Sequence, residues 1–429
     1  MNESPEAIKV VLGYETISNC LLCDETLEEV ISFGKTPLAN ELLTIEESKD
    51  LSCDKFDQFE LTLMRCNDCG HCQLNTLVDE DRMYRHYLYV SGTNANNVKH
   101  FKNYADKILT KFYPRSNNMR VNPVENTILE IASNDGTFLK NFPSHFNRIG
   151  VDPATNLVAI AAKNGVTNIP VFFNETTAKN EILAACKGVK PKVIVANNMF
   201  AHNKDLKTIV NGVKELLADD GTFIIENSYL LDILDKALFD LVYHEHIHHH
   251  SITALRTFFN SLGMKIYNVE RLANHGGSIR VYICKKEHKV DTDKSVYDLL
   301  DAEKTIPIKI KIFKHAVNIL KDKVLSIVDQ YKLENKKIGI LGLPAKATTM
   351  LYYFGLNEKV DFIYDDNKLK QGMCAPGSAI KISATDQIYV DNPDLLIVLA
   401  WNFADDLLKA HNKFTGKFVV PLPQYKEIQ

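Results

Sequence analysis

A short segment in the second half of the chain gathers side chains that can carry protons. Residues 243–250 read Tyr-His-Glu-His-Ile-His-His-His. A phenol, a carboxylate and several imidazoles close together suit proton transfer near neutral pH. A metal site is the other interpretation of these side chains, and we favour proton transfer over it. Histidines this dense are also found as surface decoration, so that alternative stays open.

A further candidate for proton chemistry follows a predicted strand at residues 192–197. The chain continues there as Asn197-Asn198-Met-Phe-Ala-His202. A single histidine after a strand is as typical of a structural role as of a functional one. The carboxyl edge of a parallel sheet is where ligands bind, and this place makes His202 a candidate.

An acidic, polar turn follows the first strand of the α/β pattern. Residues 130–136 read EIASNDG, and only Gly136 is a glycine. A pyrophosphate would need a glycine-rich anion cradle, so this turn suits a cationic or zwitterionic nucleoside such as S-adenosylmethionine better. Asp152 ends the next predicted strand, where a carboxylate can accept hydrogen bonds from both ribose hydroxyls. The alternative is that Asp135 and Asp152 only cap helices.

Two later motifs could contact a substrate. Residues 274–280 read NHGGSIR, and two glycines before a strand allow a ligand to approach closely, with a plain tight turn as the alternative. Residues 342–346 read GLPAK between a strand and a helix, which offers backbone N–H groups and one lysine to an anion.

Four cysteines form two C-x-x-C pairs near the start of the chain, Cys20 with Cys23 and Cys66 with Cys69. Two such pairs complete a tetrahedral zinc site, which is structural because four sulfurs leave no open position. The alternative is a set of unrelated buried thiols. Cys72 is expected to pack beside the site, with a ligand role as the lesser alternative. The other cysteines are not expected to be ligands: Cys53, Cys186, Cys284 and Cys374.

Alternating strands and helices must position these motifs. Their spacing from residue 126 predicts a parallel, doubly wound sheet, and a second α/β unit starts near residue 337. The lysine-rich stretch 290–335 predicts a helix pair broken near Pro307. The stretch 83–109 predicts a loop followed by an amphipathic helix. That loop, with Tyr84, Tyr87, Tyr89 and Ser91, is either a cover on the core or a lid over a site.

Composition narrows the function classes. The chain has 429 residues, 45% of them hydrophobic, and a net charge of −4 without a basic tract. Nucleic acid is therefore disfavoured as a partner, because phosphate neutralisation needs clustered Lys and Arg. We recognise no signal peptide and no apolar stretch long enough to span a bilayer. Together with thiolate zinc pairs, this predicts a cytoplasmic protein. We also expect a monomer or a weak homo-oligomer.

The ordered set of motifs resembles one enzyme family. The paired C-x-x-C module, E-x-x-S-N-D-G, Y-x-E-H, N-x-G-G-S-x-R, G-x-P-A-K and L-A-W-N-F (residues 399–403) occur in the order seen in sugar C-methyltransferases that act on nucleotide-linked 4-keto-deoxysugars. The resemblance implies an α/β protein with three parts: a zinc-binding module (1–75), a Rossmann-like S-adenosylmethionine methyltransferase domain (76–290) and a Rossmann-like C-terminal domain for the nucleotide-sugar (291–429). Two departures are Ala132, where a glycine is frequent, and residues 248–250, where an aromatic is frequent.

The resemblance also implies roles for residues. Catalysis is expected from His246, Glu245, Tyr243 and His202. The cofactor is expected to contact Glu130, Ser133, Asn134, Asp135, Gly136, Asp152, Asn197 and Asn198. The sugar nucleotide is expected to contact Tyr89, Ser91, His275, Gly276, Gly277, Ser278 and Lys346. Structural zinc is expected on Cys20, Cys23, Cys66 and Cys69.

The implied chemistry needs a base and no catalytic metal. A 4-keto group acidifies the hydrogen on C3, and a base removes it to give an enolate that takes a methyl group. His246 would be that base, oriented by Glu245, while His202 and Tyr243 would donate hydrogen bonds to the enolate oxygen. Three alternatives stay open: a methyltransferase with another acceptor, an NAD-dependent oxidoreductase (disfavoured by the missing G-x-G-x-x-G), and a non-catalytic zinc-dependent binding protein.

Overall fold

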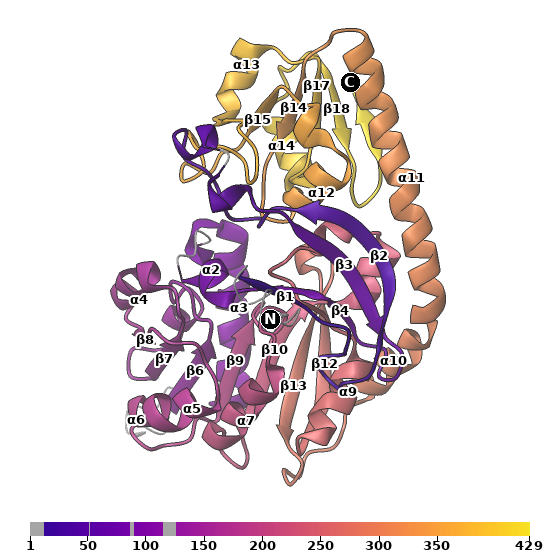
Figure 1. Ribbon diagram of the computed structural model, residues 1–429. Coiled ribbons are helices and arrows are strands. Elements are labelled where there is room, and N and C mark those ends of the chain that lie inside the picture. Colours follow the sequence, from indigo (N-terminus) through magenta and orange to yellow (C-terminus); the bar gives the residue numbers. More distant parts are fainter. Residues whose placement is uncertain (1–12, 51, 86–89, 115–125) are drawn as a thin grey trace, which may run out of the picture.

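The computed structural model describes residues 13–50, 52–85, 90–114 and 126–429. Two α/β bodies lie at opposite ends of the molecule, with the curved strands of an N-terminal module between them (Figure 1). A long orange helix runs along one side and joins the two bodies (Figure 1). This architecture confirms the predicted fold class, an α/β protein with a small N-terminal module, a central domain and a C-terminal domain.

The N-terminal module is a small antiparallel sheet completed by a strand from far along the chain. Sheet order is β11-β4-β3-β2, and β1 pairs with β5 in a separate two-stranded sheet. The elements of this part are β1 (Tyr14–Thr16), β2 (Leu27–Thr36), β3 (Phe59–Cys66), β4 (Cys72–Leu74), β5 (Thr76–Val78), α2 (Glu80–Tyr84) and β11 (His248–His249). Because β11 belongs to the predicted proton-carrying segment, that segment is paired directly with the cysteine-rich module.

The central domain is a seven-stranded sheet with the order β12-β13-β10-β9-β6-β7-β8. Its helices are α3 (Ala95–Phe112), α4 (Val158–Lys163), α5 (Glu175–Thr177), α6 (Leu183–Ala185), α7 (Leu206–Leu216), α8 (Leu230–Asp235) and α9 (Ile252–Ser261). Its strands are β6 (Thr127–Ile131), β7 (Asn147–Val151), β8 (Thr167–Ile169), β9 (Val193–Asn197), β10 (Thr222–Ser228), β12 (Met264–Leu272) and β13 (Ser278–Lys285).

One strand of this sheet departs from the predicted parallel arrangement. β13 runs antiparallel to both of its neighbours, β10 and β12. The cause is the short connection between β12 and β13, residues 273–277, which can close a hairpin but cannot cross over to a parallel strand. The turn that carries the NHGGS motif is therefore a hairpin turn at the edge of the site.

The C-terminal domain repeats the doubly wound pattern with the order β16-β15-β14-β17-β18-β19, in which only the last described pair is antiparallel. A helix break falls near Pro307, as expected, between α10 and α11. The elements are α10 (Lys294–Ala302), α11 (Ile306–Leu333), β14 (Ile338–Leu341), α12 (Ala347–Tyr353), β15 (Phe362–Tyr364), β16 (Ile382–Ser383), α13 (Ile388–Asp391), β17 (Leu395–Val398), α14 (Ala404–Ala410), β18 (Lys417–Val420) and β19 (Lys426–Ile428).

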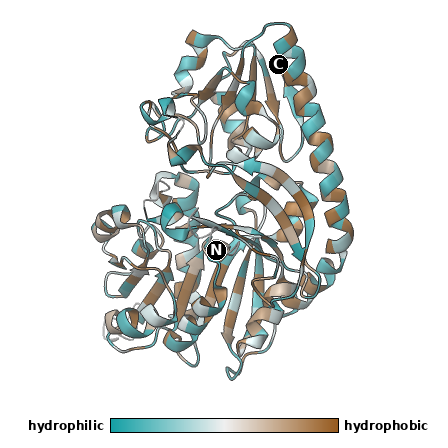
Figure 2. Cartoon of the chain, viewed as in Figure 1, coloured by the Kyte–Doolittle hydropathy of each residue, from teal (hydrophilic) through white to brown (hydrophobic). Residues whose placement is uncertain are grey.

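Burial of apolar strands joins the three parts. The central strands of both sheets are hydrophobic over most of their length, whereas the outer helices carry hydrophilic faces (Figure 2). Strands buried on both faces are expected to read as such continuous apolar runs. Phe33 of β2 packs on Phe239 of the central domain at 5.7 Å and on Tyr353 of α12 at 5.1 Å, measured between ring centroids. The N-terminal module is thus packed against both α/β domains.

No helix in the described part of the chain is long and apolar enough to cross a membrane.

Candidate active site

A cavity of about 1270 Å³ lies where the three parts meet. Its lining includes Asn40 from the N-terminal module, Tyr243 from the central domain and Trp401 from the C-terminal domain. Eleven predicted site residues line it: Ser91, Asn134, Asp152, Asn197, Asn198, His202, Tyr243, His246, His275, Gly276 and Lys346. Others lie behind this wall: Glu130, Ser133, Asp135, Gly136, Glu245, Gly277 and Ser278. Tyr89 lies outside the described residues.

Tyr243 and His246 form a hydrogen-bonded pair in the cavity. The phenol oxygen lies 2.8 Å from His246 Nε2, and His246 Nδ1 lies 2.9 Å from the carbonyl oxygen of Leu241. A carbonyl oxygen only accepts, so Nδ1 carries the ring hydrogen and Nε2 accepts from the phenol. Burial lowers the pKa of His246 well below its usual range, with further lowering from His202. The imidazole is therefore neutral, with its free electron pair aimed at the phenol of Tyr243.

His202 stands beside this pair. Its ring centroid lies 4.9 Å from that of His246, and burial lowers its pKa to about 4. The phenol oxygen of Tyr84 lies 3.4 Å from His202 Nδ1 and 3.3 Å from the carbonyl oxygen of Glu245. Two neutral imidazoles and two phenols thus meet at one place, although Tyr84 comes from α2 of the N-terminal module.

Glu245 turns away from the cavity and into the protein. Its side chain is 3% exposed, and Asn40 Nδ2 donates to its Oε1 at 2.5 Å. Sequence reasoning named Glu245 but missed Asn40. Asn40 lies 205 residues earlier, and no local pattern marks it.

The predicted cofactor turn is shaped by left-handed backbone. Ala132 has φ of 56° and Asn134 has φ of 50°, which explains why a glycine would be at ease at position 132. Asp152 directly follows β7 and accepts from the backbone N–H of Asn134 at 2.8 Å and from that of Ala154 at 2.9 Å. Because each carboxylate oxygen accepts more than one hydrogen bond, Asp152 can hold the turn and still face a ligand in the cavity. Its pKa is raised by burial.

Acceptors at this edge of the sheet suit a ligand with N–H or O–H donors. Glu130 is buried, which raises its pKa, and accepts from Asn197 Nδ2 at 2.9 Å. Glu130 Oε2 and Asn197 Oδ1 find no hydrogen-bond partner among the described residues. A cationic nucleoside with an amino group fits this donor demand, so the residues present are compatible with S-adenosylmethionine.

The remaining residues of the turn brace it. Asp135 accepts from the hydroxyl of Thr137 at 2.9 Å and from the N–H of Gly92 at 3.0 Å. The N–H of Ser91 donates to Asn134 Oδ1 at 2.9 Å, which places Ser91 on the cofactor turn. A Cβ at Gly136 would lie 2.8 Å from Val166, so close packing explains that glycine.

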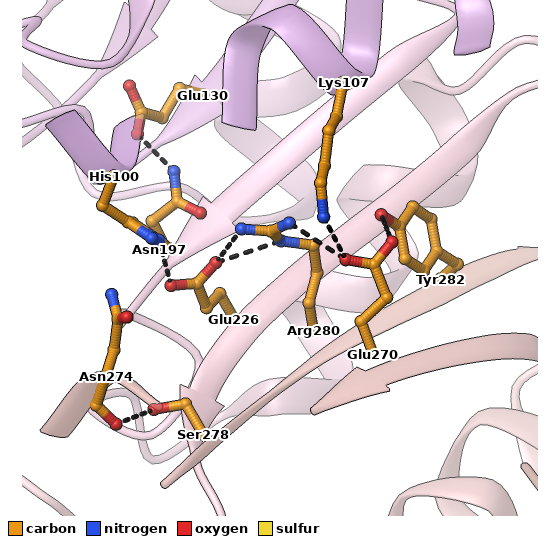
Figure 3. Close-up of polar contacts among 10 residues, drawn as sticks. All are labelled: His100, Lys107, Glu130, Asn197, Glu226, Glu270, Asn274, Ser278, Arg280 and Tyr282. Carbon is orange, nitrogen blue, oxygen red and sulfur yellow. Dashed lines mark hydrogen bonds and ion pairs between the residues drawn. The ribbon is translucent and has the colours of Figure 1, made fainter. Parts of the chain in front are cut away.

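A buried ion-pair network, which the sequence did not indicate, links α3 to strands β10, β12 and β13 (Figure 3). His100 of α3 lines the cavity, and its Nε2 lies 2.6 Å from Glu226 Oε1. Arg280 donates to Glu226 Oε2 at 2.7 and 3.0 Å, and to Glu270 at 3.3 Å. The Arg280 guanidinium also lies 3.4 Å from the ring centroid of Tyr104. Arg280 therefore acts inside the protein, where it fixes Glu226 and through it His100.

The NHGGS motif is a hairpin turn with only part of it on the cavity. His275 and Gly276 line the cavity, and His275 has φ of 54°. A Cβ at Gly277 would lie 2.3 Å from Asp232, so this glycine is needed for packing against the protein. Ser278 Oγ donates to the carbonyl oxygen of Asn274 at 3.0 Å.

Lys346 enters the cavity from the C-terminal domain with three partners. Its Nζ lies 2.9 Å from Asp240 Oδ2, donates to Asn402 Oδ1 at 2.9 Å, and stands 3.6 Å from the ring centroid of Trp401. Trp401 Nε1 donates to the same Asp240 oxygen at 2.6 Å. Burial lowers the pKa of Lys346, and the Asp240 carboxylate opposes that shift. A held cation in this place suits an anionic group on a substrate.

The four predicted zinc ligands come together at the other side of the module. Their Sγ atoms all lie within 4.8 Å of one another, with 3.7 Å between Cys20 and Cys69 and 3.4 Å between Cys23 and Cys66. Zinc–sulfur bonds of about 2.3 Å in a tetrahedron place sulfurs about 3.8 Å apart, so the cluster fits zinc. Gly70 has φ of 72°, as the predicted knuckle turn requires. Cys72 lies outside this cluster and is buried in β4.

The histidines at 248–250 are buried, so they are not surface decoration. His248 and His249 are 2% exposed and His250 is 0% exposed. His248 Nε2 donates to the carbonyl oxygen of Asn203 at 3.0 Å, so its Nδ1 accepts from His71 Nε2 at 2.8 Å. These residues join the segment 243–250 to the N-terminal module.

Three family models match successive parts of the chain. A zinc-binding domain matches residues 20–84, a methyltransferase domain matches residues 98–269, and a C-methyltransferase C-terminal domain matches residues 273–423. These matches, with the cysteine cluster, agree with the predicted cofactors, S-adenosylmethionine and zinc. The exact domain boundaries and the individual site residues remain predictions.

Among characterised proteins, the chain is similar to C-methyltransferase NovU of Streptomyces niveus. The two are 30% identical over 423 residues, which cover 96% of this chain and 97% of that protein. Among solved structures, it is similar to magnesium protoporphyrin IX methyltransferase from Synechocystis PCC 6803 with bound SAH (11% identity, 48% of this chain, 91% of that chain, TM-score 0.33). An S-adenosylmethionine-dependent methyltransferase from Clostridium acetobutylicum gives 14% identity, 43% and 92% coverage and a TM-score of 0.34. Structural likeness of this degree supports no argument.

Proposed function

Since this chain belongs to the C-methyltransferase family and is a methyltransferase, we propose that it methylates C3 of a nucleotide-linked 4-keto-deoxysugar through an enolate. The observation that carries this proposal is the neutral Tyr243–His246 pair. It faces the same cavity as the cofactor turn and the lysine of the C-terminal domain.

Proton removal is the step that this pair supports. The C3–H bond breaks, its electrons form the enolate with the C4 carbonyl, and the proton passes to His246 Nε2. The proton travels either directly or through the phenol of Tyr243, which hands its own hydrogen to Nε2 as it receives another. A neutral imidazole can accept this proton, whereas a protonated one cannot.

The depressed pKa of His246 sets a condition on this step. Burial favours the neutral ring before reaction, but it also makes the imidazolium product costly. The cost of the buried imidazolium must be offset by negative charge that develops nearby, and the enolate oxygen carries such a charge. His202 and Tyr84 place further hydrogen-bonding groups beside the pair, where an enolate oxygen would need donors.

S-adenosylmethionine, when bound, supplies an electrophilic methyl group on a sulfonium centre. The residues proposed to hold it are Asp152 at the ribose, and Asn134 and Asn197 at the polar end, with Glu130 behind the cavity wall accepting from Asn197. Their carbonyl and carboxylate oxygens favour a cationic ligand over a pyrophosphate.

The nucleotide part of the acceptor is proposed to lie toward the C-terminal domain. Lys346 and Lys370 line that side of the cavity, together with Thr385. Lysines held in a partly closed site attract diphosphate charge. A methyltransferase that acts on a small ketone without a nucleotide would have no use for this side.

A substrate screen tests the proposal. Purified protein is incubated with S-adenosylmethionine and dTDP-, GDP- or CDP-linked 4-keto-deoxysugars, and products are read by mass spectrometry. A mass gain of one methyl group on one of these sugars is expected. Methylation of a small ketone or hydroxyl acceptor, with every nucleotide-sugar left unchanged, would instead support the alternative methyltransferase function.

A further inference from the structure

The proposed catalytic segment, residues 243–246, contacts the zinc module on the side that faces away from the cavity. Tyr243 and His246 line the cavity, whereas the two residues between them turn toward the N-terminal module. His244 Nε2 lies 3.4 Å from the carbonyl oxygen of Glu60, and its ring centroid lies 5.8 Å from that of Phe59. Glu245 accepts from Asn40. Side chains of one short segment are therefore divided between the reaction space and the module.

The loop that presents Asn40 is firmly held on both sides. It follows β2, and the apolar residues around Asn40 are buried, from Leu38 at 3% exposed to Leu43 at 0%. The N–H of Cys374 in the C-terminal domain donates to the carbonyl oxygen of Leu43 at 2.7 Å. The amide of Asn40 is thus carried by backbone that is fixed to a second domain. A donor held in this way can hold the Glu245 carboxylate in one position.

We propose that Asn40 is a positioning residue of the catalytic machinery, which fixes Glu245 and through it the backbone of the Tyr243–His246 pair. The zinc module would then also position the His246 side chain relative to the bound sugar, in addition to its structural role. This inference rests on the proposed function, because it assigns Asn40 a role in the same proton transfer.

The tertiary contacts give a reason why this donor matters. Glu245 is nearly fully buried, and a buried carboxylate that loses one of its donors reorients or draws in water. Glu245 lies between His244 and His246 in sequence, so its displacement moves the base directly. A base displaced by about 1 Å costs on the order of 10²-fold in rate.

The test compares substitutions at two neighbouring positions of the same loop. Asn40→Ala removes the donor, and Asn40→Asp replaces it by a group of nearly the same shape. The matched control is Glu41→Gln. Glu41 accepts from Arg82 at 2.6 and 2.8 Å and lies away from the cavity lining.

The expected result separates positioning from folding. Asn40→Ala should lower kcat by about 10- to 100-fold, while KM for S-adenosylmethionine, zinc content and Tm stay near wild type. Glu41→Gln should keep kcat within about twofold, as is usual for a partly exposed ion pair. Exchange of the C3 hydrogen with solvent deuterium should fall in parallel with kcat in the Asn40→Ala variant.

A pH profile gives a readout that a merely structural asparagine would not move. At neutral pH, the carboxylate introduced by Asn40→Asp would face Glu245 and repel it. At lower pH the introduced group becomes protonated and can donate as the amide does, so kcat of Asn40→Asp relative to wild type should rise as pH falls. In a double-mutant cycle, Asn40→Ala should add little to the loss already caused by Glu245→Gln.

Two results would overturn the inference. One is wild-type kcat in Asn40→Ala; the other is a loss that tracks zinc content or Tm in both Asn40 variants. Failure of the proposed function would look different, because wild-type protein would then methylate no 4-keto sugar. The ratio of Asn40→Ala to wild type can still be measured on whichever acceptor wild type uses.

Discussion

The two α/β domains build the same backbone arrangement at the first turn of their sheets. In the central domain, Asp152 accepts from the N–H of Asn134 at 2.8 Å and from that of Ala154 at 2.9 Å. In the C-terminal domain, Asp365 accepts from the N–H of Leu343 at 2.8 Å and from that of Asn367 at 2.8 Å. Each aspartate directly follows the second strand and ties down the turn after the first, because the carboxyl ends of neighbouring parallel strands meet at one edge.

The two turns differ in the ionisable side chains beside them. The central turn carries Glu130 and Asp135, whereas Lys346 and Lys370 stand beside the C-terminal turn, paired with Asp240 and Asp365. Equal backbone geometry with lysines beside only one of the turns suits an anionic ligand better at that turn than at the other. The comparison teaches that the fold supplies the place for a ligand, while a few side chains decide its charge.

The largest effect on stability is expected from loss of the zinc, because the zinc module packs between the two α/β domains. Removal of zinc from a four-cysteine site costs on the order of 10 kcal/mol in isolated zinc-binding peptides, so the metal-free protein should unfold at a much lower temperature. Calorimetry with and without a strong chelator, together with elemental analysis, measures this. Cys72→Ser should keep about one zinc per chain, and unchanged Tm without metal would contradict the zinc assignment.

His246→Ala tests whether His246, which lines the cavity shared by the two turns, is the base that removes the C3 hydrogen. Loss of a general base typically costs 10²–10⁴-fold, roughly 3–5 kcal/mol of barrier, and should abolish deuterium incorporation at C3. His202→Asn should cost less, because the amide keeps one hydrogen bond. Tyr243→Phe separates the two proton routes: a loss as large as that of His246→Ala indicates transfer through the phenol. Near wild-type methylation by His246→Ala would show that another group is the base.

A crossed pair of substitutions tests the charge comparison itself. Asp152→Asn should weaken S-adenosylmethionine binding by about 1–3 kcal/mol and leave the nucleotide-sugar unaffected. Asp365→Asn should do the reverse if the C-terminal turn holds the nucleotide. Isothermal titration of both variants with both ligands measures the four affinities. If both substitutions weakened both ligands equally, the central turn could not be assigned to S-adenosylmethionine and the C-terminal turn to the nucleotide-sugar.

The smallest effect is expected from pH, through the buried histidines that attach the catalytic segment to the zinc module. Burial lowers the pKa of His244 to about 4 and that of His250 to about 3. The unfolded chain binds protons on these rings below about pH 6.5, whereas the folded chain does not, so stability falls as pH drops from about 6.5 toward 3. Each ring contributes a slope of at most about 1.4 kcal/mol per pH unit.

The pH prediction is measured by urea unfolding of His250→Phe beside wild type. The variant should lose part of the slope between about pH 6 and 4, while the zinc thiolates contribute equally to both proteins. An unchanged slope would mean that His250 is protonated in the folded protein or exposed to solvent.

Local patterns in the sequence determined much of this protein. The two C-x-x-C pairs predicted a cluster that the structure brings within 4.8 Å, because a knuckle needs only neighbouring residues and a turn. Strand–turn–helix repeats predicted two α/β domains, since the period of apolar residues is a local property. The polar turn at residues 130–136 and Asp152 were found by their positions after consecutive strands, and in the structure the backbone N–H of Asn134 donates to the Asp152 carboxylate.

Only the tertiary structure decided how the catalytic segment is held. Asn40 and Glu245 are 205 residues apart, His100 and Glu226 are 126 apart, and Tyr84 and His202 are 118 apart. No periodicity or spacing marks such partners, because each contact forms where two separately folded elements happen to meet. The antiparallel β13, the roles of Gly277 and Arg280 inside the protein, and the burial of His248 to His250 were decided in the same way. The sequence alone identifies side chains that can take part in chemistry, whereas the packing of the three parts determines which of these side chains contact one another.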